Sequence, residues 1–190
     1  MQVRSITLVR HGRTAYNKAG RIQGWVDIPL DATGQWQVEQ TGRALRDLYV
    51  TSEPAARQLV VASDLKRAQQ SAHAFADPLG LDVHVDGRLR ERHFGDWEGM
   101  SMDELRAAFP DDFDLWMRGL GGEMRHRAES HAHAGARGWD ALRDWSHRAG
   151  SDTDLFVFSH GALIENTIQE MYGIGERFAD TVQLDRSREQ

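Results

Sequence analysis

Short apolar runs alternate with longer segments of helical pattern along this chain, and this alternation constrains the fold more than any other feature. Continuous apolar runs are typical of strands that are buried in a sheet. We predict strands at residues 4–9, 59–62, 81–85, 155–158 and 181–184. We predict helices at about residues 34–49, 65–77, 126–148 and 161–172, and one more after Ser101. Strands that alternate with helices indicate an α/β domain with a largely parallel sheet.

Local signals refine these predicted helices. Short polar side chains at a helix start accept hydrogen bonds from the free backbone N–H groups. Such caps are expected at Asp31 or Thr33, at Ser63 and Asp64, and at Ser101 in an S-x-x-E capping box. Glycines at residues 119–122 predict a break in the chain, and we interpret Trp36, Trp139 and Trp145 as core or interface residues.

The composition excludes several classes of protein. With 190 residues, the chain has the size of one domain, which we expect to span residues 1–190. Its 40% hydrophobic and 27% charged residues are ordinary for a globular protein and exclude a disordered chain. No apolar run is long enough to span a membrane and no signal peptide is predicted, so we expect no association with a membrane. A net charge of −6 argues against nucleic acid as a partner. Cysteine is absent, which excludes a disulfide framework and fits a cytoplasmic protein.

Two of the predicted strands end in a histidine followed by a glycine, His11-Gly12 and His160-Gly161. In open α/β sheets, ligands bind beyond the carboxyl ends of the strands, so we expect both histidines at the same rim. Gly161 also begins a predicted helix, whose free N–H groups favour an anion, and we include it among the expected substrate-binding residues.

Two arginines are expected at this rim. Arg10 directly precedes His11, and Arg67 lies one turn into the helix that follows the second strand. Two arginines and two histidines around one point repel each other unless an anion lies between them. A phosphate monoester, with a charge of about −1.5 to −2, is such an anion.

The residues around these positions match a known family. Residues 8–17, LVRHGRTAYN, resemble the R-H-G-x-T-x-x-N signature of the histidine phosphatase superfamily, also called the phosphoglycerate mutase-like family. The resemblance continues in order through residues 21–30, 63–72, 90–99 and 159–161. It implies a three-layer α/β/α sandwich with a mostly parallel central sheet. It also implies a covalent phosphohistidine mechanism.

The resemblance implies roles for individual residues. His11 is the expected nucleophile. Glu91 is expected to act first as the general acid and then as the general base, and Asp96 and Glu98 are the candidates for this role if Glu91 does not have it. The expected phosphate and substrate contacts are Arg10, Arg67 and His160, then Asn17, Gln23 and Gly24. Because arginines bind phosphate oxygens bidentately, no metal or other cofactor is expected.

Within the family, phosphatases and 2,3-bisphosphoglycerate-dependent phosphoglycerate mutases both occur. The mutases are longer chains that carry a lysine shortly after the glycine corresponding to Gly99, and a pair of arginines further on. Residues 100–102 contain no lysine, and the chain has no such arginine pair. We therefore predict a phosphomonoesterase that hydrolyses a small phosphorylated metabolite, with the mutase as the alternative.

Three positions depart from the family pattern, namely Arg13, Glu165 and the segment 121–123, so the substrate stays open. A catalytically inactive phosphate-ester binding module is an alternative of another class. A metal site at His126, His131 and His133 is another, although residues two apart do not share a helix face. A homodimer is expected from the family resemblance alone.

Overall fold

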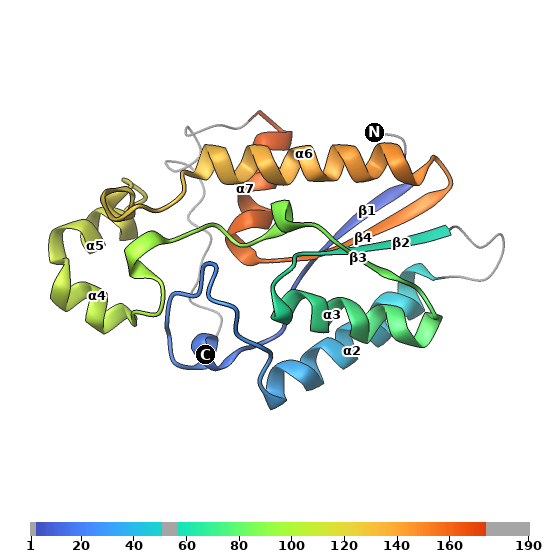
Figure 1. Ribbon diagram of the computed structural model, residues 1–190, viewed down its shortest axis with the longest axis horizontal. Helices are drawn as coiled ribbons and strands as arrows, with labels where there is room; N and C mark the ends of the chain where they lie inside the picture. The colour runs from blue at the N-terminus through green and yellow to red at the C-terminus, as the bar shows by residue number, and fades with distance from the viewer. Residues whose placement is uncertain (1–2, 51–56, 174–190) are drawn as a thin grey trace.

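The computed structural model describes residues 3–50 and 57–173, and these form an α/β sandwich around a parallel sheet (Figure 1). The strands are β1 (Ser5–Arg10), β2 (Arg57–Ala62), β3 (Val83–Val85) and β4 (Thr153–Ser159). Their order is β1-β4-β2-β3, and each neighbouring pair is parallel. The predicted α/β class and parallel sheet are confirmed. The strand predicted at residues 181–184 lies outside the described residues.

Two helices pack on each face of the sheet. Helices α2 (Ala32–Tyr49) and α3 (Lys66–Ala76) cover one face, and α6 (His131–Ala149) and α7 (Gly161–Met171) cover the other (Figure 1). Along β4, alternate side chains enter two separate clusters. Phe156 and Phe158 pack with residues of α3, whereas Leu155 and Val157 pack with residues of α6 and α7. Burial on both faces explains why β4 is a continuous apolar run.

The predicted caps are partly confirmed. Asp31 accepts from the backbone N–H of Gly34 at the start of α2, and Ser101 forms a reciprocal capping box with Glu104. The cap predicted at Ser63 and Asp64 is wrong, because α3 begins after Leu65 and has no side-chain cap. The Asp64 carboxylate is instead bidentate to Arg90, with Nη2 and Oδ2 2.6 Å apart.

Between β3 and α6 the chain forms several short helices. The helix predicted after Ser101 is confirmed as α4 (Met102–Ala108), whereas α5 (Pro110–Met117) and the 3-10 helix η4 (Gly122–His126) were not predicted. The remaining short helices are α1 (Ala15–Lys18), η1 (Asp77–Leu79), η2 (Gly87–Leu89) and η3 (Gly95–Trp97). Figure 1 shows α4 and α5 at one end of the molecule, beside the sheet. They enclose a small core of their own, made by Ile22, Trp97, Leu105 and Phe113.

Two further expectations need correction. The helix predicted at 126–148 begins only at His131, where Ser130 accepts from the backbone N–H of His133. Trp36 is 61% exposed and is therefore not a core residue, which leaves an interface role as a prediction, whereas Trp139 and Trp145 pack against the core as expected. In the described part of the chain, no helix has both the length and the apolar character that a bilayer crossing needs.

Candidate active site

The two histidine-glycine pairs meet because their strands are neighbours. In the β1–β4 register Arg10 is opposite Ser159, so the next residues, His11 and His160, emerge side by side at the carboxyl ends. Their ring centroids are 5.1 Å apart. Arg67, near the start of α3, reaches the same point and donates from Nε to His11 Nε2 at 3.3 Å. Segments that are far apart in the sequence thus form one cluster.

Hydrogen bonds fix the tautomer of His11. Its Nδ1 lies 2.7 Å from the carbonyl oxygen of Gly12, and because a carbonyl only accepts, Nδ1 carries the proton. The lone pair is then on Nε2, which faces Arg67. Burial lowers the pKa of His11 to about 3, and the charges of Arg67 and Arg10 contribute, against the opposing hydrogen bond to Gly12. His11 is therefore neutral at physiological pH, and its unprotonated Nε2 carries a nucleophilic lone pair that accepts a hydrogen bond from Arg67.

Arg67 is a fully buried cation without a carboxylate partner. It donates from Nη2 to Gly24 O at 2.8 Å and from Nη1 to Val26 O at 2.9 Å. Burial lowers the pKa of Arg67, although the charges of Glu91 and two other carboxylates oppose the shift. Among the described residues, no carboxylate lies within ion-pair distance of it. Such a site attracts an anion.

His160 is buried completely, and neither ring nitrogen has a hydrogen-bond partner within the described part of the chain. Burial holds the pKa of His160 well below its ordinary value, and the positive charge of Arg67 adds to the shift. A buried donor left unpaired costs about 1–3 kcal/mol, so its presence in a folded protein needs an explanation. A ligand that accepts a hydrogen bond between Arg67 and His11 provides one.

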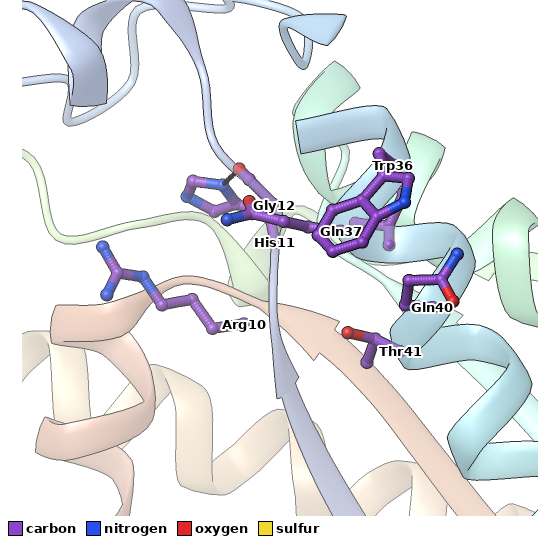
Figure 2. Close-up of a pocket in the computed structure, with 8 residues that line it drawn as sticks. Arg10, His11, Gly12, Trp36, Gln37, Gln40 and Thr41 are labelled. Atoms are coloured by element: carbon purple, nitrogen blue, oxygen red, sulfur yellow. Dashed lines mark hydrogen bonds between the residues drawn. The ribbon is translucent and has the colours of Figure 1, made fainter. Parts of the chain in front are cut away.

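Arg10 is exposed at the edge of this cluster. Figure 2 shows the Arg10 and His11 side chains on one side of the chain, with Trp36, Gln40 and Thr41 of α2 on the other. A Cβ atom at Gly161 would lie 3.4 Å from Arg10 Nε, so the Arg10 side chain passes the start of α7. A pocket of about 390 Å³ lies between the end of β1 and α2, and it is lined by Arg10, His11, Gly12, Trp36, Gln37, Val38, Gln40 and Thr41.

The Glu91 carboxylate lies at the N-terminus of α7. It accepts from the backbone N–H groups of Leu163 at 2.9 Å, Ala162 at 3.3 Å and Arg92 at 2.8 Å. Burial raises the pKa of Glu91, while these three donors and the charge of Arg67 oppose the shift. The anion expected at this helix terminus is therefore, in this structure, a side chain of the protein itself.

Asn17 and Gln23 are joined through Thr14. Their side-chain oxygens accept from Thr14, with distances of 3.1 Å from Thr14 N to Asn17 and 2.8 Å from Thr14 Oγ1 to Gln23. The amide NH2 groups are therefore the parts that could donate to a ligand. Gly24, next to Gln23, contributes the carbonyl oxygen that holds Arg67.

The three departures from the family pattern lie outside the histidine cluster. Arg13 donates to Asp31 and Thr33 at the start of α2, and Glu165 is exposed on α7. Glu123 is buried against Arg92, with 2.6 Å between Oε1 and Nη2. Burial would raise the pKa of Glu123, but hydrogen bonds from His131 and Arg92 and the charge of Arg92 lower it to about 2.

The alternative metal site is not supported by the positions of its histidines. His126 bonds to Asp112, His131 to Asn166, and His133 to Glu129. Within residues 3–50 and 57–173, no three His, Asp or Glu side chains are arranged to hold a metal ion.

Two residues near Glu91 were not predicted from the sequence. Trp25 donates from its indole Nε1 to the Glu91 carbonyl oxygen at 2.7 Å, and Arg137 donates to the same oxygen at 2.9 Å. Arg137 lies in the middle of α6, where neither spacing nor a motif separates it from other helix arginines. Only the three-dimensional structure relates it to the site.

Comparison with known proteins places this geometry in a family. The sequence matches the pattern described as "Histidine phosphatase superfamily (branch 1)" over residues 6–187. A glucosyl-3-phosphoglycerate phosphatase of Mycolicibacterium vanbaalenii is 35% identical over 181 residues, which cover 92% of this chain and 76% of that protein. A 2,3-bisphosphoglycerate-dependent phosphoglycerate mutase of Bifidobacterium longum is 36% identical over 117 residues, or 60% of this chain and 46% of that protein.

A solved structure agrees with the sequence comparison. A mycobacterial glucosyl-3-phosphoglycerate phosphatase in complex with VO3 superposes with a TM-score of 0.79 at 28% identity. The alignment covers 90% of this chain and 83% of that chain. The chain belongs to branch 1 of the histidine phosphatase superfamily.

Proposed function

We propose that this chain is a phosphomonoesterase that hydrolyses a small phosphorylated metabolite through a phosphohistidine at His11. The observation that carries the proposal is the state of His11, whose Nδ1–H is held by Gly12 O and whose Nε2 lone pair faces Arg67. Neutral imidazole is a nucleophile, and the buried cation beside it attracts a phosphate.

In the first half of the proposed reaction, His11 Nε2 attacks phosphorus and the bond from phosphorus to the ester oxygen breaks. Protonated Glu91 gives its proton to the leaving oxygen, and its raised pKa suits this role. Arg10, Arg67 and His160 stabilise the charge on the equatorial phosphate oxygens. Asn17, Gln23, Gly24 and Gly161 contact the substrate.

In the second half, Glu91 is a carboxylate and takes a proton from water. The oxygen of this water attacks phosphorus, the phosphorus–nitrogen bond breaks, and inorganic phosphate leaves with neutral His11 restored. One carboxyl group serves both steps because the acid of the first is the base of the second. The positive charges come from side chains, so the proposed reaction requires no metal ion.

The first substrate class to test is the phosphoglycerate-type metabolites, because the relative at 35% identity is a glucosyl-3-phosphoglycerate phosphatase. Hydrolysis is favoured over mutase activity because residues 100–102 contain no lysine. With 3-phosphoglycerate and a bisphosphoglycerate primer, phosphate should be released faster than 2-phosphoglycerate forms. The opposite order would favour the mutase.

The decisive experiment is to trap the phosphoenzyme. After a denaturing quench with 32P-labelled substrate, the label should remain on the protein, stable to base and labile to acid as expected for a phosphoramidate. His11→Ala should remove both label and turnover while retaining the folded circular dichroism spectrum. A label on another residue, or turnover that survives in His11→Ala, would contradict the proposal.

A further inference from the structure

Arg137 uses its whole guanidinium group to hold the loop that carries Glu91. Its Nη1 donates to the carbonyl oxygens of Arg88 and Arg90, both at 2.7 Å, and its Nη2 donates to that of Glu91 at 2.9 Å. Nε and Nη2 also bind the Glu129 carboxylate at 2.7 and 2.8 Å. These contacts account for all five N–H donors of an arginine.

The loop has no regular structure to fix its backbone, and its other main-chain partners lie mostly at its two ends. Ser159 Oγ donates to Leu89 O at 2.8 Å, and Glu129 bonds to both the N–H and the carbonyl oxygen of His93. The loop leaves the short 3-10 helix η2 at Leu89 and runs without regular structure through His93. Irregular backbone lacks the repeating hydrogen bonds of a helix or sheet, so its carbonyl groups need other partners. Arg137, from a helix anchored in the core, provides a partner for two of them, at Arg90 and Glu91, and for the carbonyl group of Arg88 in η2.

The charge of Arg137 is balanced by the carboxylate of Glu129. Arg137 is 13% exposed at its side chain, and Glu129 is 8% exposed. Burial alone would raise the pKa of Glu129, but the hydrogen bond and charge of Arg137 lower it, so this pair is ionised. The pair does not need a substrate anion, which separates its role from that of Arg67.

Glu91 is thus held at both ends. Arg137 and Trp25 bind its main-chain oxygen, whereas the first N–H groups of α7 orient its carboxylate. The backbone position and the side-chain direction are therefore set by different elements. Loss of the backbone contact would let the carboxyl group shift relative to the leaving oxygen.

We propose that Arg137 is a positioning residue that acts through Glu91 and fixes where the acid–base carboxyl stands. This inference rests on the proposed function, because it needs Glu91 as the acid. Misplacement by about 1 Å can cost about 10²-fold in rate, so a residue that never contacts the substrate can matter this much. Its loss should then resemble a weak loss of Glu91 rather than a loss of phosphate binding.

The test compares two substrates that differ in their need for an acid. An alkyl phosphate such as glucose 6-phosphate requires protonation of its leaving oxygen, whereas para-nitrophenolate departs with little help. Arg137→Lys keeps the charge but cannot reproduce the five-donor fork, and Arg137→Met removes both. Rapid-quench measurements would give the rate of phosphoenzyme formation from each substrate, together with inhibition by inorganic phosphate.

Arg137→Lys should slow phosphoenzyme formation from the alkyl phosphate about 10-fold and Arg137→Met about 100-fold, the lower part of the range for general acid catalysis. Formation from para-nitrophenyl phosphate should fall less than about threefold, because general acid catalysis matters little there. Inhibition of Arg137→Lys by phosphate should stay unchanged. Trp25→Phe removes the second donor to Glu91 O, and it should also slow the reaction of the alkyl phosphate more than that of para-nitrophenyl phosphate, but by a smaller factor.

The Glu91→Gln variant distinguishes a failure of this inference from a failure of the proposed function. In a Glu91→Gln background, Arg137→Lys should add less than about a threefold loss, because the two changes affect one group. Equal losses of Glu91→Gln on both substrates would overturn the role of Glu91, and the inference with it. Two outcomes would overturn this inference and leave the proposed function intact. In the first, Glu91→Gln slows phosphoenzyme formation selectively on the alkyl phosphate and Arg137→Lys does not. In the second, Arg137→Lys slows the Glu91→Gln variant as much as it slows the wild type.

A matched control excludes a general effect on α6. Arg143 lies on the same helix and forms an exposed pair with Asp140, with 3.1 Å between Nη2 and Oδ1. Arg143→Lys and Arg143→Met should leave both rates unchanged. Thermal unfolding identifies any variant that does not fold. If Arg137→Met fails to fold, Arg137→Lys still decides the question, because it retains the charge that balances Glu129.

Discussion

Two groups of buried charged side chains meet at the loop that carries Glu91, and they balance their charges in opposite ways. On the α6 side, Arg92 pairs with Glu123 and Arg137 pairs with Glu129. On the strand side, the hydrogen bonds of the Arg67 side chain to the described residues go to carbonyl oxygens and to neutral His11. Each cation of the first group forms an ion pair with a carboxylate, whereas Arg67 forms none within residues 3–50 and 57–173.

This difference distinguishes buried charges that stabilise the folded structure from buried charges that bind a ligand. A buried ion is expensive to desolvate, and the cost is offset only by a partner of opposite charge. Arg92 and Arg137 have this partner within the chain and can serve the folded structure alone. In the part of the chain that the structure describes, Arg67 has no carboxylate at ion-pair distance and His160 beside it has no hydrogen-bond partner, so this half of the site favours a bound anion.

The strongest test of this contrast is to remove the unpaired cation. Arg67→Met should lower turnover by about 10³-fold, since single donors to a transition-state anion contribute about 10²–10³-fold and Arg67 also orients His11. The midpoint of thermal unfolding should change little, because removal of a buried charge without a carboxylate partner offsets the loss of the three hydrogen bonds that Arg67 donates. Inorganic phosphate should raise this midpoint in the wild type much more than in the variant.

Lys66→Met is the matched control for this experiment. Lys66 precedes Arg67 in α3 and is exposed, with Nζ 3.6 Å from Asp27. Its removal should leave turnover and phosphate stabilisation unchanged. A large loss of stability in Arg67→Met would place Arg67 with the structural charges and remove the contrast.

The opposite result is expected on the paired side. Glu123→Gln leaves Arg92 buried without a counter-charge and should lower the free energy of unfolding by about 3–5 kcal/mol. Turnover per folded molecule should change less than about threefold. Urea unfolding measures the first quantity, and active-site titration with the trapped phosphoenzyme measures the second. The exposed Glu165→Gln is the control, and a loss below about 1 kcal/mol in Glu123→Gln would contradict the prediction.

The smallest expected effect is a pH dependence of stability. The pKa of His11 is lowered from 6.5 to about 3 in the folded chain, and that of His160 is also far below 6.5. As the pH falls below about 6.5, the unfolded chain binds protons that the folded chain does not, so stability falls. Each histidine should contribute about 1.5 kcal/mol of this loss between about pH 6.5 and 5, and nothing above pH 8.

Urea unfolding in phosphate-free buffer checks this effect. His11→Gln and His160→Gln should each flatten the fall in stability below pH 6.5, whereas His84→Gln, at an exposed position, should not. An equally steep fall in all three variants would show that other groups cause it. The two buried histidines would then not be held neutral as inferred.

The predictions from sequence were most accurate where the determinants are local. The apolar run at β4 and the caps at Asp31 and Ser101 depend on neighbouring residues, and all three are confirmed. The cap at Ser63 and Asp64 was wrong because a distant arginine, Arg90, takes the Asp64 carboxylate. Helix α6 begins later than predicted because the chain before it folds into η4 over the small core.

The sequence by itself determined the family and the parallel α/β fold, because apolar periodicity and motifs are written along the chain. It also identified candidate active-site residues, namely His11, Arg67, Glu91 and His160. Only the tertiary structure decided which charges are paired, where the Glu91 carboxylate lies, and that Arg137 holds its loop. These properties depend on distances between residues that are tens of positions apart, and burial then determines how strongly each charge acts. Neither distance nor burial is encoded in the spacing of a motif.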